Sequence, residues 1–365
     1  MRLSLIGLTL SSSWGNGHAT TYRALLSGLA ELGHEVTFYE CDRPWYAAHR
    51  DLPNPDFAEL VFYNEVEDLQ RHRARIANAD AVIVGSYVVD GIAAARATRD
   101  LVRGPVLFYD IDTPVTLAAV DAGTCAYLDR PTIAAYDAYL SFTGGPTLRR
   151  LEQAYGARKA HALYCSVDPR EHEPQSMQRD VALGYLGTYS ADRQPGLERL
   201  LIEPARACPD LRFVVAGPQY PADIAWPANV ERIEHVGPEH HAAFYGRCRY
   251  TLNLTRADMR AAGWSPSVRL FEAAATNTPI LSDMWPGLED VLVPGREILT
   301  VARAEDVISI LSDADENLPR QVAAAARERV LSSHTHLHRA GELVAILDET
   351  IATSRAPERK LQLAP

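Results

Sequence analysis

Short apolar runs alternate with helical segments along the whole chain. Residues 3–10 form an apolar run, residues 19–32 repeat their apolar positions with a helical period, and residues 35–39 begin the next apolar run. Strand, turn, helix and strand in this order are typical of a parallel α/β sheet. The order starts again with the run at 181–188 and the helical segment at 195–206. The pattern therefore predicts an α/β protein built from two similar halves.

The amphipathic segment that follows Gly263 has the most specific polar pattern in the chain. Ser265 is a good N-cap and Pro266 suits the first helical position, so the sequence predicts a helix that begins here. At about 100° per residue, Ser265, Arg269 and Glu272 share one stripe. The unpaired N–H groups and positive dipole of such a helix start attract phosphate, and Arg269 would add to this. The alternative is a helix that only covers a sheet, with Arg269 and Glu272 in solvent or paired to each other.

A glycine-rich turn follows the first apolar run. Its residues Gly15, Asn16, Gly17 and His18 precede the first helical segment. Glycines let the backbone come close to a bound group, and the following helix offers another N-terminus. The turn lacks the full spacing of a dinucleotide-binding fingerprint, so a simple tight turn is the alternative.

Two carboxylates end the apolar run at 105–109. Asp110 and Asp112, with Thr113 beside them, stand at the carboxyl end of a predicted strand, where ligands bind in α/β sheets. Three roles are open for them. They could hold a metal ion as Asp-x-Asp, one could be a general base that takes a proton from a hydroxyl, or Asp112 could cap the next helix while Asp110 is structural. We expect Asp112 to be the catalytic group, with Asp110 as the second choice.

Composition and charge narrow the possible functions. The 365 residues are 47% hydrophobic and 23% charged, which suits two domains of ordinary size. A net charge of -11 argues against nucleic-acid or membrane-surface binding, since both need a basic field. An anionic substrate would therefore need a local basic pocket. No apolar run approaches the roughly 18 residues of a membrane-spanning helix.

The spacing of cysteines and histidines matches neither a disulfide framework nor a zinc site. The five cysteines are widely spaced and include no Cys-x-x-Cys pair, so we expect reduced thiols in a cytoplasmic protein. Glu239, His240 and His241 are consecutive, but they lack the helical His-Glu-x-x-His spacing. We expect a helix N-terminus there, with both histidines in solvent.

Residues 263–283 resemble the nucleotide-sugar-binding segment of GT-B glycosyltransferases, most closely the spore-maturation, CgeB-like branch of the group-1 families. Residues 33–37 (Gly-His-Glu-Val-Thr) are similar to another segment of these enzymes. The resemblance covers nearly the whole chain and implies two Rossmann-like domains that face each other across a cleft. Residues 1–168 would form the acceptor-side domain and residues 169–333 the nucleotide-sugar-binding domain. Residues 334–353 would form a C-terminal helix that returns to the first domain, and residues 354–365 a mobile tail.

The resemblance also implies roles for single residues. Glu272 would receive the ribose hydroxyls and the helix start the diphosphate. In group-1 enzymes an Arg and a Lys in the first loop of the second domain reach the diphosphate; here Thr188 stands in place of the Arg, and Arg193 is the nearest cation. The donor-binding residues expected are Glu272, Arg269, Ser265, Ser267, Arg193, Thr188, Gly217, Asn253, Arg256 and Glu289. The acceptor-side residues expected are Gly15, Asn16, Gly17, His18, Thr113 and Trp264.

Two positions depart from the family pattern. Retaining members carry Glu-x7-Glu, but Trp264 stands at the first Glu and only Glu272 remains. Trp264 could stack on a sugar or an acceptor, or it could simply pack. A His near the reacting carbon of group-1 relatives is matched here by an Asp. The identity of the sugar and the stereochemical course therefore do not carry over.

The resemblance implies a glycosyltransferase that moves a sugar from a nucleoside-diphosphate sugar, with a UDP-sugar as the expected donor, to an acceptor hydroxyl. The acceptor could be a glycan, a small molecule or a protein. GT-B enzymes stabilise the diphosphate with helix dipoles and basic side chains, so we expect no metal and no resident cofactor. Two alternatives stay open, because fold does not fix function: a sugar-nucleotide epimerase or hydrolase, and a non-catalytic sugar-nucleotide-binding protein.

Overall fold

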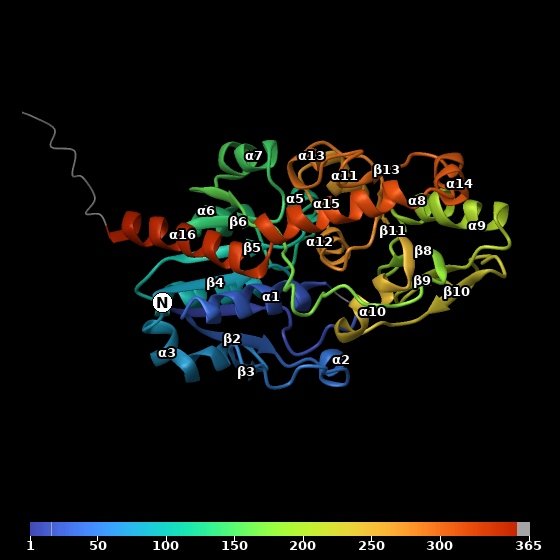
Figure 1. Ribbon diagram of the computed structural model, residues 1–365. Coiled ribbons are helices and arrows are strands. Elements are labelled where there is room, and N and C mark those ends of the chain that lie inside the picture. The colour runs from blue at the N-terminus through green and yellow to red at the C-terminus, as the bar shows by residue number, and fades with distance from the viewer. Residues whose placement is uncertain (16, 356–365) are drawn as a thin grey trace, which may run out of the picture.

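Two parallel sheets, each enclosed by helices, lie side by side in the computed structural model (Figure 1). The structure describes residues 1–15 and 17–355. The expected acceptor-side residue Asn16 and the expected tail from residue 356 onward lie outside the described residues.

The first sheet has, among the described residues, seven parallel strands in the order β3-β2-β1-β4-β5-β6-β7. The order steps outward from β1 in both directions, which is the arrangement of a Rossmann-like domain. The strands are β1 (Arg2–Gly7), β2 (Glu35–Cys41), β3 (Glu59–Tyr63), β4 (Ala81–Gly85), β5 (Val106–Asp110), β6 (Ala138–Ser141) and β7 (Ala160–Ala162). The helices are α1 (His18–Glu31), α2 (Pro44–Ala47), η1 (Val66–His72), α3 (Arg73–Ala77), α4 (Gly91–Leu101), α5 (Thr113–Asp121), α6 (Arg130–Ala135) and α7 (Pro146–Tyr155).

Successive residues of β1 face two different cores. Leu5 belongs to a cluster that includes Leu25 of α1, whereas Ile6 belongs to a cluster on the other face that includes Leu117 of α5. Successive side chains of a strand point to opposite faces of the sheet, and here helices cover both faces. The apolar runs of the sequence are therefore continuous rather than alternating.

The second sheet repeats this arrangement with the order β10-β9-β8-β11-β12-β13. Val214 of β9 packs in the cluster of Phe271, and its neighbour Val215 packs in the cluster of Leu200 on the other face. The strands are β8 (Val181–Leu186), β9 (Phe213–Ala216), β10 (Val230–Ile233), β11 (Cys248–Asn253), β12 (Ile280–Ser282) and β13 (Leu299–Thr300). Its helices are α8 (Gln194–Leu197), the π-helix η2 (Glu198–Ile202), α9 (Glu203–Ala207), η3 (Pro238–His240), α10 (His241–Gly246), α11 (Ala257–Ala262), α12 (Val268–Ala275), α13 (Leu288–Val291), α14 (Ala304–Ser312) and α15 (Asn317–Ser333), and α16 (His336–Arg355) follows them in the chain.

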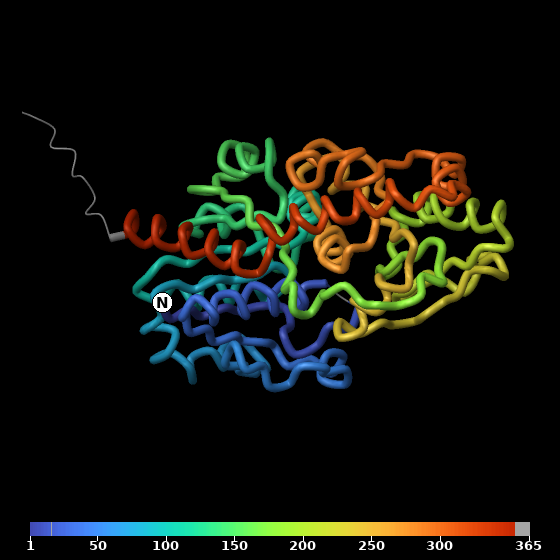
Figure 2. Tube along the Cα trace, viewed as in Figure 1, coloured from blue at the N-terminus to red at the C-terminus, as the bar shows by residue number. Residues whose placement is uncertain are grey.

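The chain passes between the two sheets twice, and the two crossings touch. The first crossing follows β7 and contains residue 168, the expected domain boundary, and the second leads from α15 into α16 (Figure 2). Val167 and Thr335 pair as an isolated parallel bridge. Helix α16 then packs along α1, where a Cβ on Gly28 would lie only 2.5 Å from the carbonyl oxygen of His336. The prediction of a C-terminal helix that returns to the first domain is confirmed.

Two local predictions need correction. Helix α12 begins at Val268, with Ser267 rather than Ser265 at its N-cap. Gly263 and Trp264 have φ of 69° and 46°, so the chain forms a loop here, and Ser265 is held by a hydrogen bond between its hydroxyl and that of Thr143 in the first domain. The helix expected at 195–206 is interrupted by the π-helical turn η2.

Among the described helices, none is long and apolar enough to span a lipid bilayer.

Candidate functional site

A cavity of about 540 Å³ lies between the two sheets, at the carboxyl ends of their strands. We call it the cleft cavity. Most of the residues expected to bind ligand line it: Gly15, Gly17, His18, Asp112, Thr188, Arg193, Gly217, Arg256, Ser265, Ser267, Arg269 and Glu272. The lining does not include Asp110, Thr113, Asn253, Trp264 or Glu289. The structure thus brings together groups that lie far apart in the sequence.

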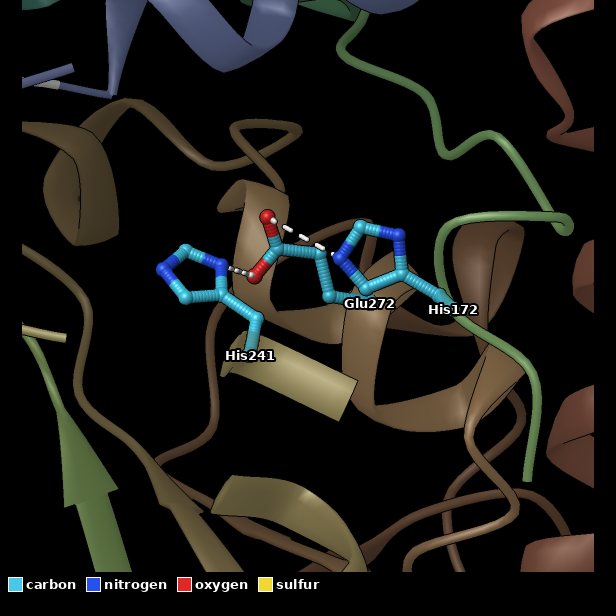
Figure 3. Close-up of side chains that lie close together, drawn as sticks. All are labelled: His172, His241 and Glu272. Atoms are coloured by element: carbon cyan, nitrogen blue, oxygen red, sulfur yellow. Dashed lines mark ion pairs between the residues drawn. The ribbon is translucent and has the colours of Figure 1, made fainter. Parts of the chain in front are cut away.

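Glu272 is buried in the wall of the cleft cavity and is held by three side chains. The hydroxyl of Tyr245 donates a hydrogen bond of 3.0 Å to Oε2. Nδ1 of His241 lies 3.3 Å from Oε2, and Nε2 of His172 lies 3.7 Å from Oε1 (Figure 3). Burial alone would raise the pKa of this carboxyl, but attraction to His241 and His172 outweighs it and lowers the pKa to about 2. Glu272 is therefore an ionised acceptor for hydroxyl groups.

The prediction that both histidines of 238–241 lie in solvent is wrong for one of them. His240 is exposed, but His241 turns inward toward Glu272. Burial lowers the pKa of His241, yet the charge of Glu272 raises it further, so the net shift is upward. His241 and Tyr245 are four residues apart and so share one face of α10, a spacing that could have suggested a common target. No signal in the sequence pointed to His172, which lies in the first crossing.

The guanidinium of Arg269 is held in place by one backbone group and two side chains. Its Nε donates to the carbonyl oxygen of Leu186 at 2.7 Å, and its Nη1 donates to Oδ1 of Asn253 at 2.9 Å. The guanidinium lies over the ring of Tyr185, 4.8 Å from its centroid. Arg269 is therefore not paired with Glu272. It fixes the loop after β8 and leaves Nη2 at the cleft cavity, next to Gly187.

The loops after β8 and β9 approach each other at two glycines. Gly217 has a φ of 141°, and a Cβ there would lie 2.1 Å from the carbonyl oxygen of Gly187. A Cβ on Gly187 would lie 2.7 Å from Nη2 of Arg269. A larger residue at either position would collide with Gly187 or with Arg269, so these glycines let the two loops and the guanidinium pack closely in the wall of the cleft cavity.

Asn253 supports the site from behind. Its side-chain oxygen accepts hydrogen bonds from Ser267 Oγ and from Arg269, and its Nδ2 donates to Ser282 Oγ. Asn253 itself is fully buried. It therefore orders the start of α12 and does not itself line the cleft cavity.

Two more cations line the cleft cavity. Arg193 donates through Nη2 to the carbonyl oxygen of Thr188 at 2.7 Å. Nη1 of Arg256 lies 3.8 Å from Asp112, and its Nε lies 3.9 Å from Asp192. Together with Arg269 and the N-terminus of α12, they form a local basic edge in a chain whose net charge is -11.

Asp112 reaches the cleft cavity from the first domain. It accepts a hydrogen bond of 3.0 Å from the hydroxyl of Tyr87, and Nε2 of His18 lies 3.8 Å from it. Burial would raise the pKa of Asp112, but His18, Arg256 and Tyr87 outweigh it and lower the pKa. Asp112 occupies the N-cap position of α5 without a side-chain cap hydrogen bond, so the capping role is wrong. Tyr87, which the sequence did not single out, has a left-handed φ of 62°.

Asp110 has a different environment, although it is only two residues away. It is fully buried and accepts hydrogen bonds from Tyr139, Thr116 and the amide of Asp112. Burial raises its pKa to about 6. Thr113 is buried beside it and donates to its carbonyl oxygen. Asp110 and Thr113 thus support the end of β5 and do not line the cleft cavity.

Trp264 and Glu289 lie outside the cleft cavity. The indole of Trp264 packs between Gly145 and Gly287, and its Nε1 donates to Asp290 at 2.7 Å. Glu289 is exposed on α13. Of the two interpretations of Trp264, the structure favours packing between the domains over stacking on a ligand.

Two groups in the described part of the chain bring histidine and carboxylate ligand atoms within 4.8 Å of one another. One is His172, His241 and Glu272 at the cleft, and the other is Glu31, Asp168 and His336 beside the crossings. Asp110 and Asp112 are in neither group.

Comparisons with known proteins agree with this geometry. Residues 193–345 match a family model described as glycosyl transferase-like. A search of curated proteins gives no significant match. The family match confirms the prediction of a glycosyltransferase at the level of this domain, and the CgeB-like branch is not named by it.

Several solved structures share the fold over almost their whole length. Sucrose-phosphate synthase from Thermosynechococcus elongatus has a TM-score of 0.67 and 15% identity, with 96% of this chain and 99% of that chain covered. Anabaena HepE in complex with UDP and glucose has a TM-score of 0.68 and 9% identity, with coverage of 96% and 100%. An alpha-glucosyltransferase in complex with UDP-glucose and DNA containing an abasic site has a TM-score of 0.71 and 12% identity, with coverage of 95% and 99%. Residues 193–345 are thus a glycosyl transferase-like domain, and the chain as a whole has the GT-B fold.

Proposed function

We propose that this protein transfers a sugar from a UDP-sugar to an acceptor hydroxyl, and that its specific relatives are the CgeB-like enzymes. The observation that carries the proposal is the cleft cavity itself. Its second-domain wall offers Arg193, Arg269, the start of α12 and an ionised Glu272, and its first-domain wall offers His18 and Asp112. The groups of the second-domain wall are suited to bind a diphosphate and a ribose, and those of the first-domain wall are suited to transfer a proton.

The basic edge stabilises the leaving group. When the bond between the anomeric carbon and the diphosphate oxygen breaks, its electron pair and the negative charge move onto the diphosphate. The first-turn amides of α12 and the guanidinium of Arg269 are fixed in place before the reaction, so they stabilise this charge without reorganising. No step requires a metal ion, and we propose metal-independent transfer.

His18 is the better general base, with Asp112 as its partner. The lowered pKa of Asp112 makes it a weak base at neutral pH, whereas the neighbouring imidazole of His18 can carry a proton beside that carboxylate. As the acceptor oxygen bonds to the anomeric carbon, its proton passes to His18, and the nearby carboxylate of Asp112 stabilises the resulting imidazolium. Tyr87 and Arg256 hold that carboxylate in place.

Two further observations support the proposed UDP-sugar donor and the proposed cytoplasmic location. HepE and the alpha-glucosyltransferase, which share the fold, were solved with UDP or UDP-glucose. All five cysteines are free thiols, three of them buried, which suits a reducing, cytoplasmic environment.

A thermal-shift panel tests the proposal. UDP should raise the melting temperature of the wild-type protein equally with EDTA and with Mg²⁺, because a ligand that binds only the native state stabilises it. Glu272→Ala should lose most of this shift. If no nucleoside diphosphate stabilises the protein, the proposal fails. Release of free sugar from the donor at the same rate with and without acceptors would favour the hydrolase instead.

A further inference from the structure

Three side chains from separate elements converge on one point beside the cleft cavity. His172 comes from the first crossing, His241 begins α10, and Glu272 lies on α12 (Figure 3). Nε2 of His172 and Nδ1 of His241 point at opposite oxygens of the Glu272 carboxylate, at 3.7 Å and 3.3 Å. Both nitrogens are buried, and neither has a hydrogen bond of good geometry.

The remaining polar atoms of the triad are already used. Nδ1 of His172 donates to the carbonyl oxygen of Asp168 at 3.3 Å, and His241 is hydrogen-bonded to the backbone of Val236. Backbone bonds of this kind orient metal-binding imidazoles and aim their other nitrogen inward. A neutral imidazole whose inward lone pair faces a carboxylate is repelled by it, and either a proton on that nitrogen or a metal cation bound between the groups removes the repulsion.

The spacing of the ligand atoms fits a small transition-metal ion. Zinc lies about 2.0–2.2 Å from nitrogen and oxygen ligands, so neighbouring ligands of a tetrahedral site are about 3.4 Å apart. The observed 3.3 Å and 3.7 Å bracket this separation, and all three ligand atoms lie within 4.8 Å of one another. Small rotations of the side chains would complete the site.

The triad is reachable from two sides. His241 and Glu272 line the cleft cavity, and His172 and Glu272 line a second cavity of about 830 Å³ beside the first crossing. Glu171 and Glu239 also line this second cavity and add negative charge to the route. An ion held by three protein ligands would keep an open position for water.

We propose that His172, His241 and Glu272 form a binding site for a divalent transition-metal ion such as Zn²⁺, and that this ion and the sugar nucleotide exclude each other. The exclusion rests on the proposed function, in which Glu272 receives the donor ribose. A carboxylate that is bound to a metal ion has fewer free lone pairs for ribose hydroxyls. The ion is thus an inhibitor of donor binding and takes no part in transfer.

The first test is a zinc titration of the full chain after treatment with EDTA, followed by calorimetry. We expect one Zn²⁺ per chain in the wild type, and binding at least about 10-fold weaker in His172→Ala and in His241→Ala, because each loses one of three ligands. His240→Ala is the matched control, since its side chain is 72% exposed and it is not among the three residues whose ligand atoms converge. His172→Gln, with melting curves for every variant, guards against misfolding. Absence of zinc binding in the wild type, or binding unchanged in the folded His172 and His241 variants, would overturn the site.

The second test measures UDP binding with and without Zn²⁺ in the same samples. We expect UDP affinity to fall at least about 10-fold when zinc is saturating, and to be insensitive to zinc in His172→Gln. Unchanged UDP affinity in zinc-loaded wild type would refute the exclusion. Failure to bind UDP even after EDTA treatment would refute the proposed function, and the zinc titration would still decide the metal site.

Discussion

The two walls of the cleft cavity hold their carboxylates in different ways. In the first domain, two carboxylates two residues apart have opposite environments: Asp110 is enclosed by hydroxyls away from the cavity, and Asp112 faces it among His18, Tyr87 and Arg256. In the second domain, the single carboxylate of Glu272 is both buried and at the cavity, because two histidines offset its charge. Position at a strand end therefore places a group near the site, and its neighbours decide its role.

The largest expected effect separates the two aspartates by activity. Asp112→Asn should lower kcat by about 10²- to 10⁴-fold, the usual contribution of general acid-base groups, because the imidazolium of His18 loses its partner. Asp110→Asn, assayed beside it with the same donor, should lose less than about 10-fold. A larger loss in Asp110→Asn than in Asp112→Asn would reverse the assignment.

The next effect concerns pH and stability. The pKa of Asp110 in the folded protein, about 6, lies above the 3.8 of an exposed Asp, so the native state favours the protonated form. This contribution is fully present below pH 3.8 and is lost as pH rises through 6. The free energy of unfolding of Asp110→Asn should therefore gain about 2 kcal/mol relative to wild type between about pH 4 and pH 7. Urea unfolding at several pH values would measure it, and a difference independent of pH would contradict it.

A smaller effect is expected at the second wall. Glu272→Gln keeps the shape of the side chain but removes its charge, and hydrogen bonds to charged groups are worth about 1.5–3 kcal/mol. The affinity for UDP, measured by calorimetry in EDTA, should fall by about 10- to 100-fold. Glu239→Gln, whose side chain is 62% exposed, is the control and should bind as wild type.

The smallest effect is expected at Glu289, and it tests how far the donor-binding site extends. Glu289 is exposed on α13 and does not line the cleft cavity, so Glu289→Ala should change kcat/KM by less than about twofold. A loss of 10-fold or more in steady-state kinetics would mean that the donor extends beyond the cavity described above.

The fold and the location of the site could be predicted from the sequence, because apolar runs, glycine turns and helix periods are local signals. Arg269 and Glu272 were found by their spacing on one helix. Their contacts with Asn253, His241 and His172 could not be predicted, since these residues meet them only after the chain has folded. The start of α12 was misplaced for the same reason, as Ser265 is bonded to Thr143 of the other domain. The choice between Asp110 and Asp112 as the group at the cavity likewise required three-dimensional neighbours.

The paired crossings at Val167 and Thr335 have a mechanical consequence. Because both connections between the halves run through one place, we expect any opening of the cleft to be a rotation about these residues. His172 lies five residues past Val167 and touches Glu272. We therefore expect domain rotation to move His172 relative to the carboxylate of Glu272, because His172 lies in the connecting segment itself.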